Sequence, residues 1–187
     1  AETLEDNLLA WGGNYLNGAI QVAPDQMGMA DTTILMGGDE SVLQQHRADL
    51  EILGGNLRHL GNKAASSPAM DLATLTWLYG SYIGLMYGVK LSQAFGLNLK
   101  DYGSVIQDVV PGFSLFFKHQ IEMISQGNYE VDQSPLSISV SATRRIADTF
   151  KDIPVAQEFP QIIAAILQDA NATYGLEHKE VADIEKI

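Results

Sequence analysis

The chain has 187 residues, of which 46% are hydrophobic, and it carries a net charge of −12 at pH 7. This length suffices for one domain, or for a small domain joined to part of another. The strong negative charge argues against nucleic acid or an anionic membrane surface as a partner. The absence of cysteine excludes disulfides, thiolate nucleophiles and cysteine zinc sites.

The first third of the chain, residues 1–61, alternates between helical and strand patterns. An N-terminal helical stripe ends at Gly12-Gly13, and a second helix lies between the second and third of the expected strands. Strands are expected at residues 14–22, 32–36 and 56–60. Strand, helix, strand at this spacing is typical of an α/β sheet. One covering helix leaves the other face of such a sheet bare, so we expect the last part of a larger Rossmann-type domain.

Residues 62–96 are expected to form a linker and one long interdomain helix. Ser67 suits an N-cap and Pro68 the first helical position, and the apolar run continues to about Phe95, before Gly96. The run is long enough to resemble a membrane span, but its polar and aromatic residues lie in the middle rather than at the ends. A helix that is apolar nearly all round is otherwise a buried one.

The remainder, residues 97–187, is expected to be a helical domain, so the fold class is α/β followed by all-α. Asn98 caps the first of these helices, which we expect Pro111-Gly112 to interrupt, and Gly127 opens a turn. Further helices are expected to open at Ser134-Pro135 and at Pro160, and residues 178–187 close the chain. The N-terminus lacks the basic and apolar regions of a signal peptide, and a cytoplasmic location is expected.

Gly80, Gly84 and Gly88 recur every fourth residue along the long helix. At about 100° per residue they lie opposite the face that carries Asp71 and Tyr82. Glycines four apart let another helix approach closely, in water as in lipid. Contact with a second subunit and plain core packing within one chain explain this spacing equally well.

Several common catalytic patterns are missing from the sequence. There is no G-x-G-x-x-G, no phosphate-binding glycine loop followed by lysine, and no G-x-S-x-G. The four histidines are scattered without ligand-spaced companions, so no metal site is expected; they are His46, His59, His119 and His178.

Asp71 stands at the start of the long helix and has two interpretations. An acid in the first turn of a helix is favoured by the helix dipole, and on residue chemistry alone this interpretation is preferred. The functional alternative is a proton donor or an anchor for a cationic amine in an interdomain cleft. Burial beside Trp77, Leu78 and Tyr79 would favour the neutral form that a general acid needs, whereas an anchor needs the charged form. The sequence leaves the two roles open.

The segments GNYLNGAIQVAP (13–24), ILMGGDESVLQQHRADLEILGGNLRHLG (34–61) and MDLATLTWLYGSYIGLMYG (70–88) resemble the NADPH-dependent imine reductases and reductive aminases. These enzymes are relatives of the 6-phosphogluconate and β-hydroxyacid dehydrogenases. The resemblance implies a Rossmann domain, a long interdomain helix and a helical C-terminal domain that intertwines with a second subunit in a homodimer. It extends more weakly through GNYEVDQSPLSISV (127–140) to the end of the chain.

Two departures from the β-hydroxyacid dehydrogenases favour the imine reductase branch. Asp71 stands where those dehydrogenases carry a catalytic lysine, and residues 17–22 replace their D-A-P-V-S-G motif. In imine reductases the first position is commonly Asp or Tyr. Gly112 falls near a position that is aromatic in the family, which leaves the substrate pocket undefined.

The resemblance also implies roles for individual residues. Asp71 would protonate or orient the substrate nitrogen, with Tyr79 assisting as the second catalytic residue. Tyr82 and Ser139 would bind substrate, although Ser139 stands near a position where some members carry glutamine, and core packing is the preferred role of Tyr82. Pro24 would contact the cofactor NADPH, whose site lies largely in a part of the Rossmann domain outside this chain.

The sequence therefore predicts the C-terminal portion of an NADPH-dependent oxidoreductase that transfers hydride to a C=N bond. Its substrates would be a small imine, or a carbonyl compound plus an amine. The chain alone is expected to bind NADPH weakly and to be inactive. Two alternatives stay open, a β-hydroxyacid or semialdehyde reductase and a non-catalytic helical dimerisation module.

Overall fold

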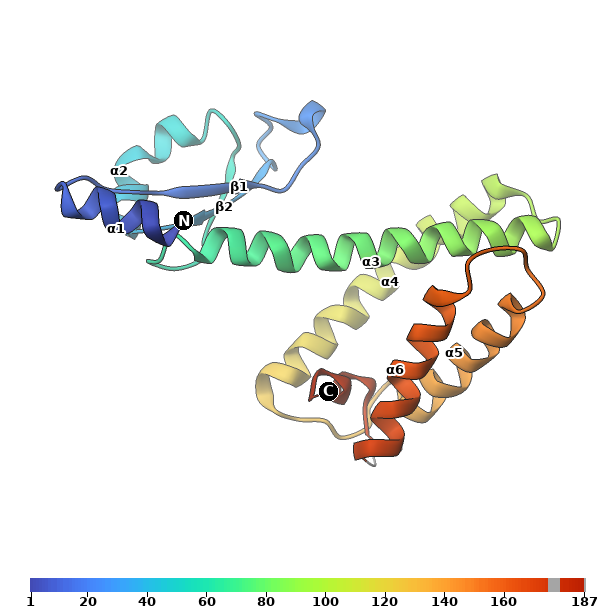
Figure 1. Cartoon of the computed structure of the whole chain (residues 1–187). Coiled ribbons are helices and arrows are strands. Elements are labelled where there is room, and N and C mark those ends of the chain that lie inside the picture. The colour runs from blue at the N-terminus through green and yellow to red at the C-terminus, as the bar shows by residue number, and fades with distance from the viewer. Residues whose placement is uncertain (175–178, 187) are drawn as a thin grey trace. The chain divides into compact units, whose positions relative to one another are not determined.

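The computed structural model describes residues 1–174 and 179–186. The chain divides into two compact units, an N-terminal unit of residues 1–84 and a C-terminal unit of residues 85–187. Each unit has its own hydrophobic core, and the long helix α3 (Ser66–Ala94) contributes its first part to one unit and its last part to the other (Figure 1). The predicted fold class, a small sheet followed by helices, is confirmed.

A three-stranded sheet forms the centre of the N-terminal unit. Its elements are α1 (Glu2–Ala10), β1 (Asn17–Ile20), the 3-10 helix η1 (Pro24–Gln26), β2 (Thr33–Gly37), α2 (Glu40–Leu50) and β3 (Asn56–His59). The strand order is β1-β2-β3, with β1 antiparallel to β2 and β2 parallel to β3. A parallel pair needs a crossover connection, and α2 supplies it. The predicted strand, helix, strand arrangement is therefore confirmed.

Local sequence explains how β2 and α2 come together. On β2, Ile34 and Met36 are buried and pack with Leu43 of α2 and Leu57 of β3. Asp39 caps α2, because its carboxylate accepts hydrogen bonds from the backbone nitrogens of Ser41 at 2.7 Å and Val42 at 3.4 Å. The side-chain hydrogen bond from Ser41, together with the bonds from these backbone groups, lowers the pKa of Asp39.

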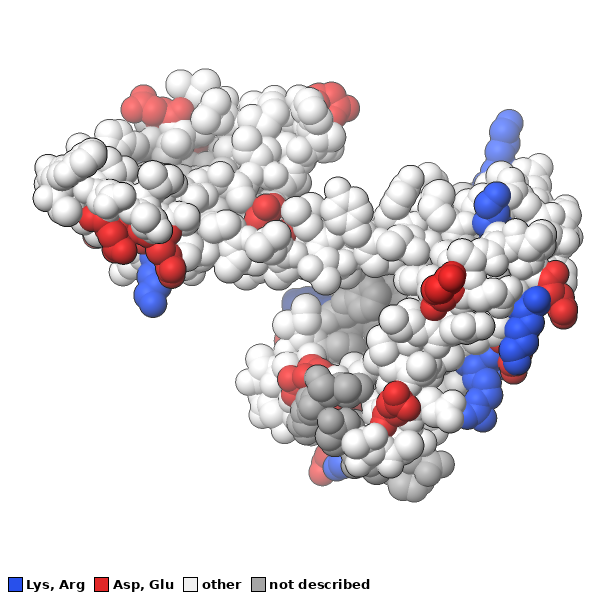
Figure 2. All heavy atoms as spheres, viewed as in Figure 1, with Lys and Arg blue, Asp and Glu red and all other residues white. Residues whose placement is uncertain are grey.

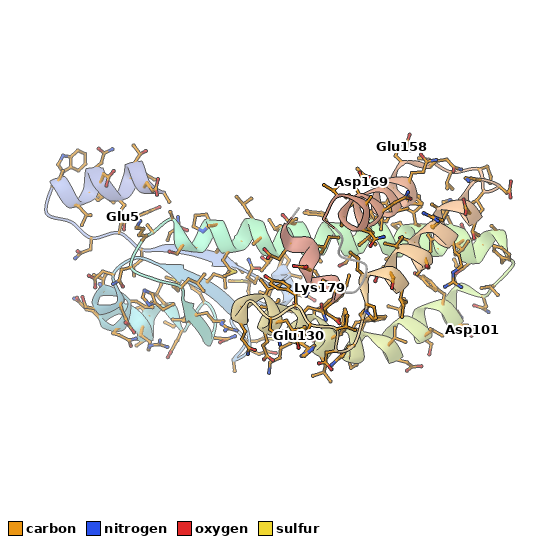
Figure 3. All side chains as sticks on the ribbon, turned by 90° about the horizontal axis from the view of Figure 1, so that it is seen from below. Glu5, Asp101, Glu130, Glu158, Asp169 and Lys179 are labelled. Atoms are coloured by element: carbon orange, nitrogen blue, oxygen red, sulfur yellow. The ribbon has the colours of Figure 1, made fainter. Side chains whose placement is uncertain are left out.

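The beginning of α3 is attached to the end of β2. The hydroxyl of Ser67 is fully buried and donates to the carbonyl oxygen of Leu35 at 2.8 Å. Gly37 permits this approach, since a Cβ there would lie 2.8 Å from the carbonyl oxygen of Lys63. The carboxylate of Glu5, labelled in Figure 3, accepts the backbone N–H of Ala64 at 3.2 Å. The prediction that Ser67 caps the helix is wrong: α3 begins at Ser66, and the Ser67 hydroxyl is used in a tertiary contact instead.

Helices make up most of the C-terminal unit. After the end of α3 come α4 (Leu99–Gln126), α5 (Leu136–Phe150), α6 (Glu158–Tyr174) and the 3-10 helix η3 (Val181–Lys186). As predicted, the side chain of Asn98 caps α4 by accepting from Lys100 N at 2.8 Å, and Gly127 ends it in the left-handed conformation with φ 63°. Leu136 of α5 and Ala170 of α6 form the centre of the core, and the two helices lie side by side (Figure 1).

The predicted interruption at Pro111 is wrong, because α4 continues through this residue. A proline inside a helix lacks the N–H that would bond to the carbonyl four residues earlier, which here is Gln107. Both residues are exposed, so water can satisfy that carbonyl, and the remaining turns keep their hydrogen bonds. A single proline on the outer side of a long amphipathic helix is thus tolerated.

The glycines of α3 differ in what surrounds them. A Cβ on Gly88 would overlap the side chain of Tyr102 on α4, whose Cζ atom lies 2.7 Å away. At this position the glycine serves packing within the chain. Among the described residues nothing lies within 4 Å of a Cβ placed on Gly80, so that end of the row remains open to another helix.

Apolar side chains of α3 are exposed rather than buried as expected from its composition. Trp77 is 60% exposed, and α3 carries only two charged residues, Asp71 and Lys90. Figure 2 accordingly shows a mostly uncharged surface along this helix. Within the described residues, no helix has the length and apolar character needed to cross a lipid bilayer.

Candidate functional site

Asp71 belongs to a small hydrogen-bonded cluster in the N-terminal unit. The side-chain nitrogen of Gln21 donates to Asp71 Oδ1 at 2.6 Å. Thr74 Oγ1 lies 2.7 Å from Gln21 Oε1 and 2.9 Å from the backbone oxygen of Asp71, so its hydroxyl can donate to either. The amide of Gln21 thus bridges two side chains of α3, and it fixes the orientation of the Asp71 carboxylate.

Two elements bring the cluster together. Gln21 directly follows β1 and continues its pairing, because its backbone nitrogen donates to the carbonyl oxygen of Thr33 at 3.0 Å. Asp71 and Thr74 lie one turn apart on α3, on the same side of the helix. β1 pairs with β2, and α3 is attached to β2 through Ser67. This arrangement holds the amide of Gln21 and the carboxylate of Asp71 at hydrogen-bonding distance.

The simple interpretation of Asp71 as a helix-start acid is wrong. α3 begins at Ser66 and has no acidic residue in its first turn. Asp71 comes five residues after Ser66, and the dipole effect falls off within the first turn. The tertiary hydrogen bond from Gln21, fifty residues away in sequence, accounts better for an acid at this position.

The sequence left open whether Asp71 is buried among its helix neighbours, and within the N-terminal unit these neighbours are exposed. Asp71 is half-buried, and Trp77, Leu78 and Tyr79 are 60%, 48% and 61% exposed. Among the described residues Asp71 Oδ2 has no hydrogen-bond donor, so one carboxylate oxygen is held by Gln21 and the other is available to a ligand. Such a carboxylate can accept a hydrogen bond from an amine or an iminium N–H.

Tyr79 and Tyr82 both lie on the exposed surface of α3. They are 61% and 55% exposed, and among the described residues neither phenol has a hydrogen-bond partner. At 1.5 Å per residue, their Cα atoms lie about 12 Å and about 16 Å along the helix from that of Asp71. Because side chains on a helix lean toward its N-terminus, Tyr79 can face the same small molecule as Asp71 more readily than Tyr82 can. Core packing, the preferred role of Tyr82, is not observed within the chain.

Pro24 lies at the start of η1, three residues after Gln21, and is exposed. No interaction joins it to the Asp71 cluster in the described part of the chain. The backbone nitrogen of Ala23 instead donates to Gln26 Oε1 at 3.3 Å, a hydrogen bond within this short turn.

An open groove of about 740 Å³ lies in the C-terminal unit. It contains two positions that the sequence singled out, Ser139 on α5 and Gly112 on α4. The lining residues come from α4, the loop before α5, α5 itself and η3, and they are Asp108, Val109, Gly112, Phe113, Phe116, Gln133, Ser134, Ser139 and Val181. A volume of this size, lined mainly by apolar and aromatic side chains with a few polar groups, suits a small organic molecule.

The charge of the groove restricts what it can bind. Among the described residues that line it, Asp108 is the one charged residue, and these residues include no lysine or arginine. A carboxylate ligand would therefore meet a like charge and no cationic partner, whereas an amine or a neutral molecule would be accepted. Gly112, which stands near an aromatic position of the family, leaves space beside Phe113 and Phe116.

The described residues hold no cluster of three or more side chains suited to a metal ion. His119 lies 2.9 Å from Asp132 Oδ2 on the surface of the C-terminal unit, and His59 Nε2 lies 2.8 Å from the carbonyl oxygen of Gly38. His178 lies outside the described residues.

Sequence reasoning missed Gln21, Thr74 and Glu180, the last a buried carboxylate beside the groove. Thr74 could have been found from its spacing, since it follows Asp71 by three residues. Gln21 and Glu180 give no local signal, because their partners lie 46 or more residues away in the chain.

Comparison with known proteins places the chain in a family. The family described as "NADPH-dependent reductive aminase-like, C-terminal domain" matches residues 64–183, which include all of α3 and all of the described lining residues of the groove. The chain belongs to this reductive aminase-like family. The resemblance inferred from the sequence is thereby confirmed.

Individual relatives agree with this assignment. The NADPH-dependent reductive aminase of Aspergillus oryzae is 23% identical over 174 residues, which are 91% of this chain and 59% of that protein. An imine reductase variant from Myxococcus stipitatus, solved with NAD+, has a TM-score of 0.91 at 22% identity, over 100% of this chain and 66% of that one. A reductive aminase from Aspergillus terreus, solved with NADPH and ethyl levulinate, has a TM-score of 0.88 at 21% identity, over 100% and 65%. At these identities the solved structures establish the shared fold, and the chain spans less than two thirds of each relative.

Proposed function

We propose that this chain is the C-terminal part of an NADPH-dependent oxidoreductase of the imine reductase type, in which Asp71 binds the substrate nitrogen. Hydride would pass from the nicotinamide to the carbon of a C=N bond. Membership of the reductive aminase-like family supports this reaction class. The observation that carries the role of Asp71 is its carboxylate, fixed on one oxygen by Gln21 and open on the other.

The cofactor is proposed to be bound mainly by a part of the protein outside this chain. The glycine turn that leads from β2 into α2 resembles a strand–helix phosphate site in its connectivity. Here, however, Asp39 occupies the backbone N–H groups of Ser41 and Val42, and its negative charge would repel a phosphate. The described residues therefore do not fit the pyrophosphate of a dinucleotide, and only Pro24 is proposed to contact the cofactor.

Asp71 is better suited to anchor a cationic nitrogen than to act as a neutral acid. The amide nitrogen of Gln21 donates to Asp71 Oδ1 at 2.6 Å, so this oxygen is an acceptor and the second oxygen is left for a ligand. The free oxygen could then accept the N–H of an iminium ion or a protonated amine and orient it for reduction. Tyr79 is proposed to assist with a hydrogen bond from its exposed phenol.

The groove is proposed to bind the apolar part of the substrate, with Ser139 as a hydrogen-bonding group on its wall. Its composition favours an imine or amine over a β-hydroxyacid, since a carboxylate substrate would find Asp108 and no cation among the lining residues that the structure describes. This is the main argument against the alternative hydroxyacid reductase. Tyr82, more than 10 Å along the helix from Asp71 by the 1.5 Å rise per residue, is proposed to contact only a larger substrate.

A homodimer is proposed as the working form of the protein. Exposed apolar side chains are concentrated on α3 and α4, including Leu72, Trp77, Phe113 and Leu115 with exposures of 54% to 71%. Surfaces of this kind are commonly covered in an assembly. If the protein has no reductase activity, the same surface supports the second candidate function, a helical dimerisation module without catalysis.

The proposed function is tested by assaying the full-length protein for NADPH oxidation with cyclic imines and, in parallel, with β-hydroxyacids and NADP+. Imine turnover that Asp71→Ala reduces at least about tenfold, the effect of losing 1.4 kcal/mol of transition-state binding, is the expected result. Asp169→Ala is the matched control, because Asp169 is an exposed carboxylate on α6 (Figure 3) and should leave turnover unchanged. Full imine turnover by Asp71→Ala would remove Asp71 from the mechanism, and turnover of β-hydroxyacids alone would replace the proposed reaction.

A further inference from the structure

Glu180 is a carboxylate that is completely buried, at 0% exposure, immediately before η3. Its Oε1 atom accepts from Ser134 N at 2.7 Å and from the side chain of Gln120 at 3.0 Å. Its Oε2 atom accepts from Asp132 N at 3.1 Å and from Gln133 N at 3.2 Å. Burial alone would raise the pKa of Glu180, but these hydrogen bonds outweigh it and the pKa is lowered. The side chain is therefore held as a charged acceptor for successive backbone N–H groups.

Backbone pairing strengthens the same connection. Leu136 N donates to the carbonyl oxygen of Lys179 at 2.9 Å, and Val181 N donates to that of Ser134 at 2.8 Å. Lys179 also pairs with Glu130 in an isolated antiparallel bridge, and both residues are labelled in Figure 3. Hydrogen bonds from the segment Lys179 to Val181 thus hold the loop that leads into α5 in place.

The loop that Glu180 binds, residues 132–134, also forms part of the groove lining. Gln133 and Ser134, whose backbone nitrogens bind Glu180, line the groove together with Val181, the residue that follows Glu180. Ser139 lies on the first turn of α5, whose first residue Leu136 is itself bonded to Lys179. Glu180 does not line the groove, yet it is bonded to residues that form one side of it.

We propose that Glu180 is a positioning residue for the groove, holding the 132–134 loop and Val181 in the arrangement that binds the apolar part of the substrate. The proposal rests on the proposed function of the groove as a substrate-binding surface. It differs from a role in folding alone, because it assigns to a buried residue an effect on ligand affinity.

The chemistry of the four donors makes the charge of Glu180 essential. In Glu180→Gln one oxygen becomes an NH₂ group, which is a donor only. Either orientation of the new amide would place that group against a backbone N–H, that of Ser134 on one side or those of Asp132 and Gln133 on the other. The side chain of Gln120 could turn its amide over, but backbone N–H groups cannot, so the loop must move away.

The experiment compares Glu180→Gln with Glu185→Gln in the full-length protein. Glu185 is an exposed carboxylate of η3 that accepts from the phenol of Tyr129 at 2.6 Å, and this bond raises the pKa of Tyr129 to about 12. The bond joins η3 to Tyr129, which precedes the 132–134 loop. Glu185 itself does not line the groove and does not bind the 132–134 loop. Glu180→Gln is expected to raise KM for an imine substrate about tenfold, the effect of one lost charged hydrogen bond, with kcat changed far less, and Glu185→Gln to leave KM unchanged.

Two further measurements separate positioning from folding. Glu180→Asp keeps a charged acceptor and should recover part of the affinity for substrate. If Glu180→Gln does not unfold cooperatively, KM is compared between Glu180→Asp and wild type instead. Amide hydrogen exchange at Gln133 and Ser134 should accelerate in Glu180→Gln and not in Glu185→Gln. A lowered Tm with wild-type KM in Glu180→Gln would overturn the proposal, as would an equal rise of KM in both variants.

The outcome is distinguishable from failure of the proposed function. If the wild-type protein reduces no imine, the proposed function fails, and binding of cyclohexylamine followed by NMR chemical shifts of groove residues decides the role of Glu180. Weaker binding to Glu180→Gln than to wild type supports the proposal. Equal binding to the two, or no binding to wild type, overturns it.

Discussion

Replacement of Gln21 by leucine tests whether the orientation of Asp71 matters. Leucine is apolar, one atom shorter than glutamine and unable to donate, so Asp71 Oδ1 loses the hydrogen bond that Gln21 supplies at 2.6 Å. Thr74 keeps its bond to the backbone oxygen of Asp71 at 2.9 Å, so the local helix should be unaffected. The change thus frees the carboxylate to rotate without removing it.

The expected magnitude follows from the geometry of the cluster. A hydrogen bond to a charged group contributes about 1.5–3 kcal/mol when it is well buried. Gln21 and Asp71 are only half-buried, so water replaces part of the interaction and about 1 kcal/mol is a suitable value. If this energy maintains the reactive orientation, kcat/KM for imine reduction should fall about fivefold.

The measurement is NADPH oxidation at saturating cofactor with a cyclic imine, using the full-length protein. Thr74→Val is the matched control, because it removes the hydroxyl that approaches Gln21 at 2.7 Å but leaves the donor to Asp71 in place. Its effect should be clearly smaller than that of Gln21→Leu. Unchanged kcat/KM in Gln21→Leu, in protein whose Tm and circular dichroism match wild type, would refute the reasoning that the amide orients the carboxylate.

Three other predictions concern acid stability, assembly and cofactor binding. Because the pKa of Glu180 is lowered in the folded chain, its stabilising contribution is complete above the pKa of the unfolded state and is lost as pH falls through the lower folded value. Tm measured from pH 7 down to pH 3 should therefore fall less in Glu180→Gln than in wild type; equal falls would contradict this. Gly80→Leu should weaken self-association in analytical ultracentrifugation, because no described residue fills the space beside Gly80, whereas unaltered sedimentation would show that this face is not the interface. The 187-residue chain alone should show no tight, saturable NADPH binding in a fluorescence titration, since Asp39 occupies the N–H groups at the start of α2; saturation at micromolar NADPH would contradict the absence of a phosphate site.

The order of elements could be predicted because local signals mark most boundaries. The glycine pairs separate the strands and helices of the N-terminal unit, and Asn98 and Gly127 delimit α4 as expected. The resemblance to imine reductases could also be identified from sequence, since it rests on contiguous segments around the start of α3. These features depend on residues that are neighbours in the chain.

The errors came from tertiary contacts and solvent exposure, which local patterns do not encode. Ser67 has the residue type of an N-cap, but its hydroxyl binds the carbonyl oxygen of Leu35, 32 residues away. Pro111 has the residue type of a helix breaker, but its exposed position lets α4 continue. Trp77 was expected in a core, yet the single chain leaves it 60% exposed.

In the candidate site, too, some residues could be identified from the sequence and others only from tertiary contacts. Asp71 was found because its position on the interdomain helix departs from the dehydrogenase pattern. Gln21 was not, because its role appears only when the end of β1 reaches α3. Glu180 was not identified from the sequence, and only its burial and four hydrogen-bond donors distinguish it.

The separate cores of the two units have a practical consequence for altering selectivity. The aromatic residues Phe113 and Phe116 of the groove belong to the C-terminal unit, whereas the sheet that fixes Asp71 is stabilised by Ile34, Met36 and Leu43 in the other. If the proposed function is correct, combinatorial libraries that vary the groove should change which substrates are accepted and leave the hydrogen bond between Gln21 and Asp71 unchanged. Screening such libraries would not require compensating mutations around β2.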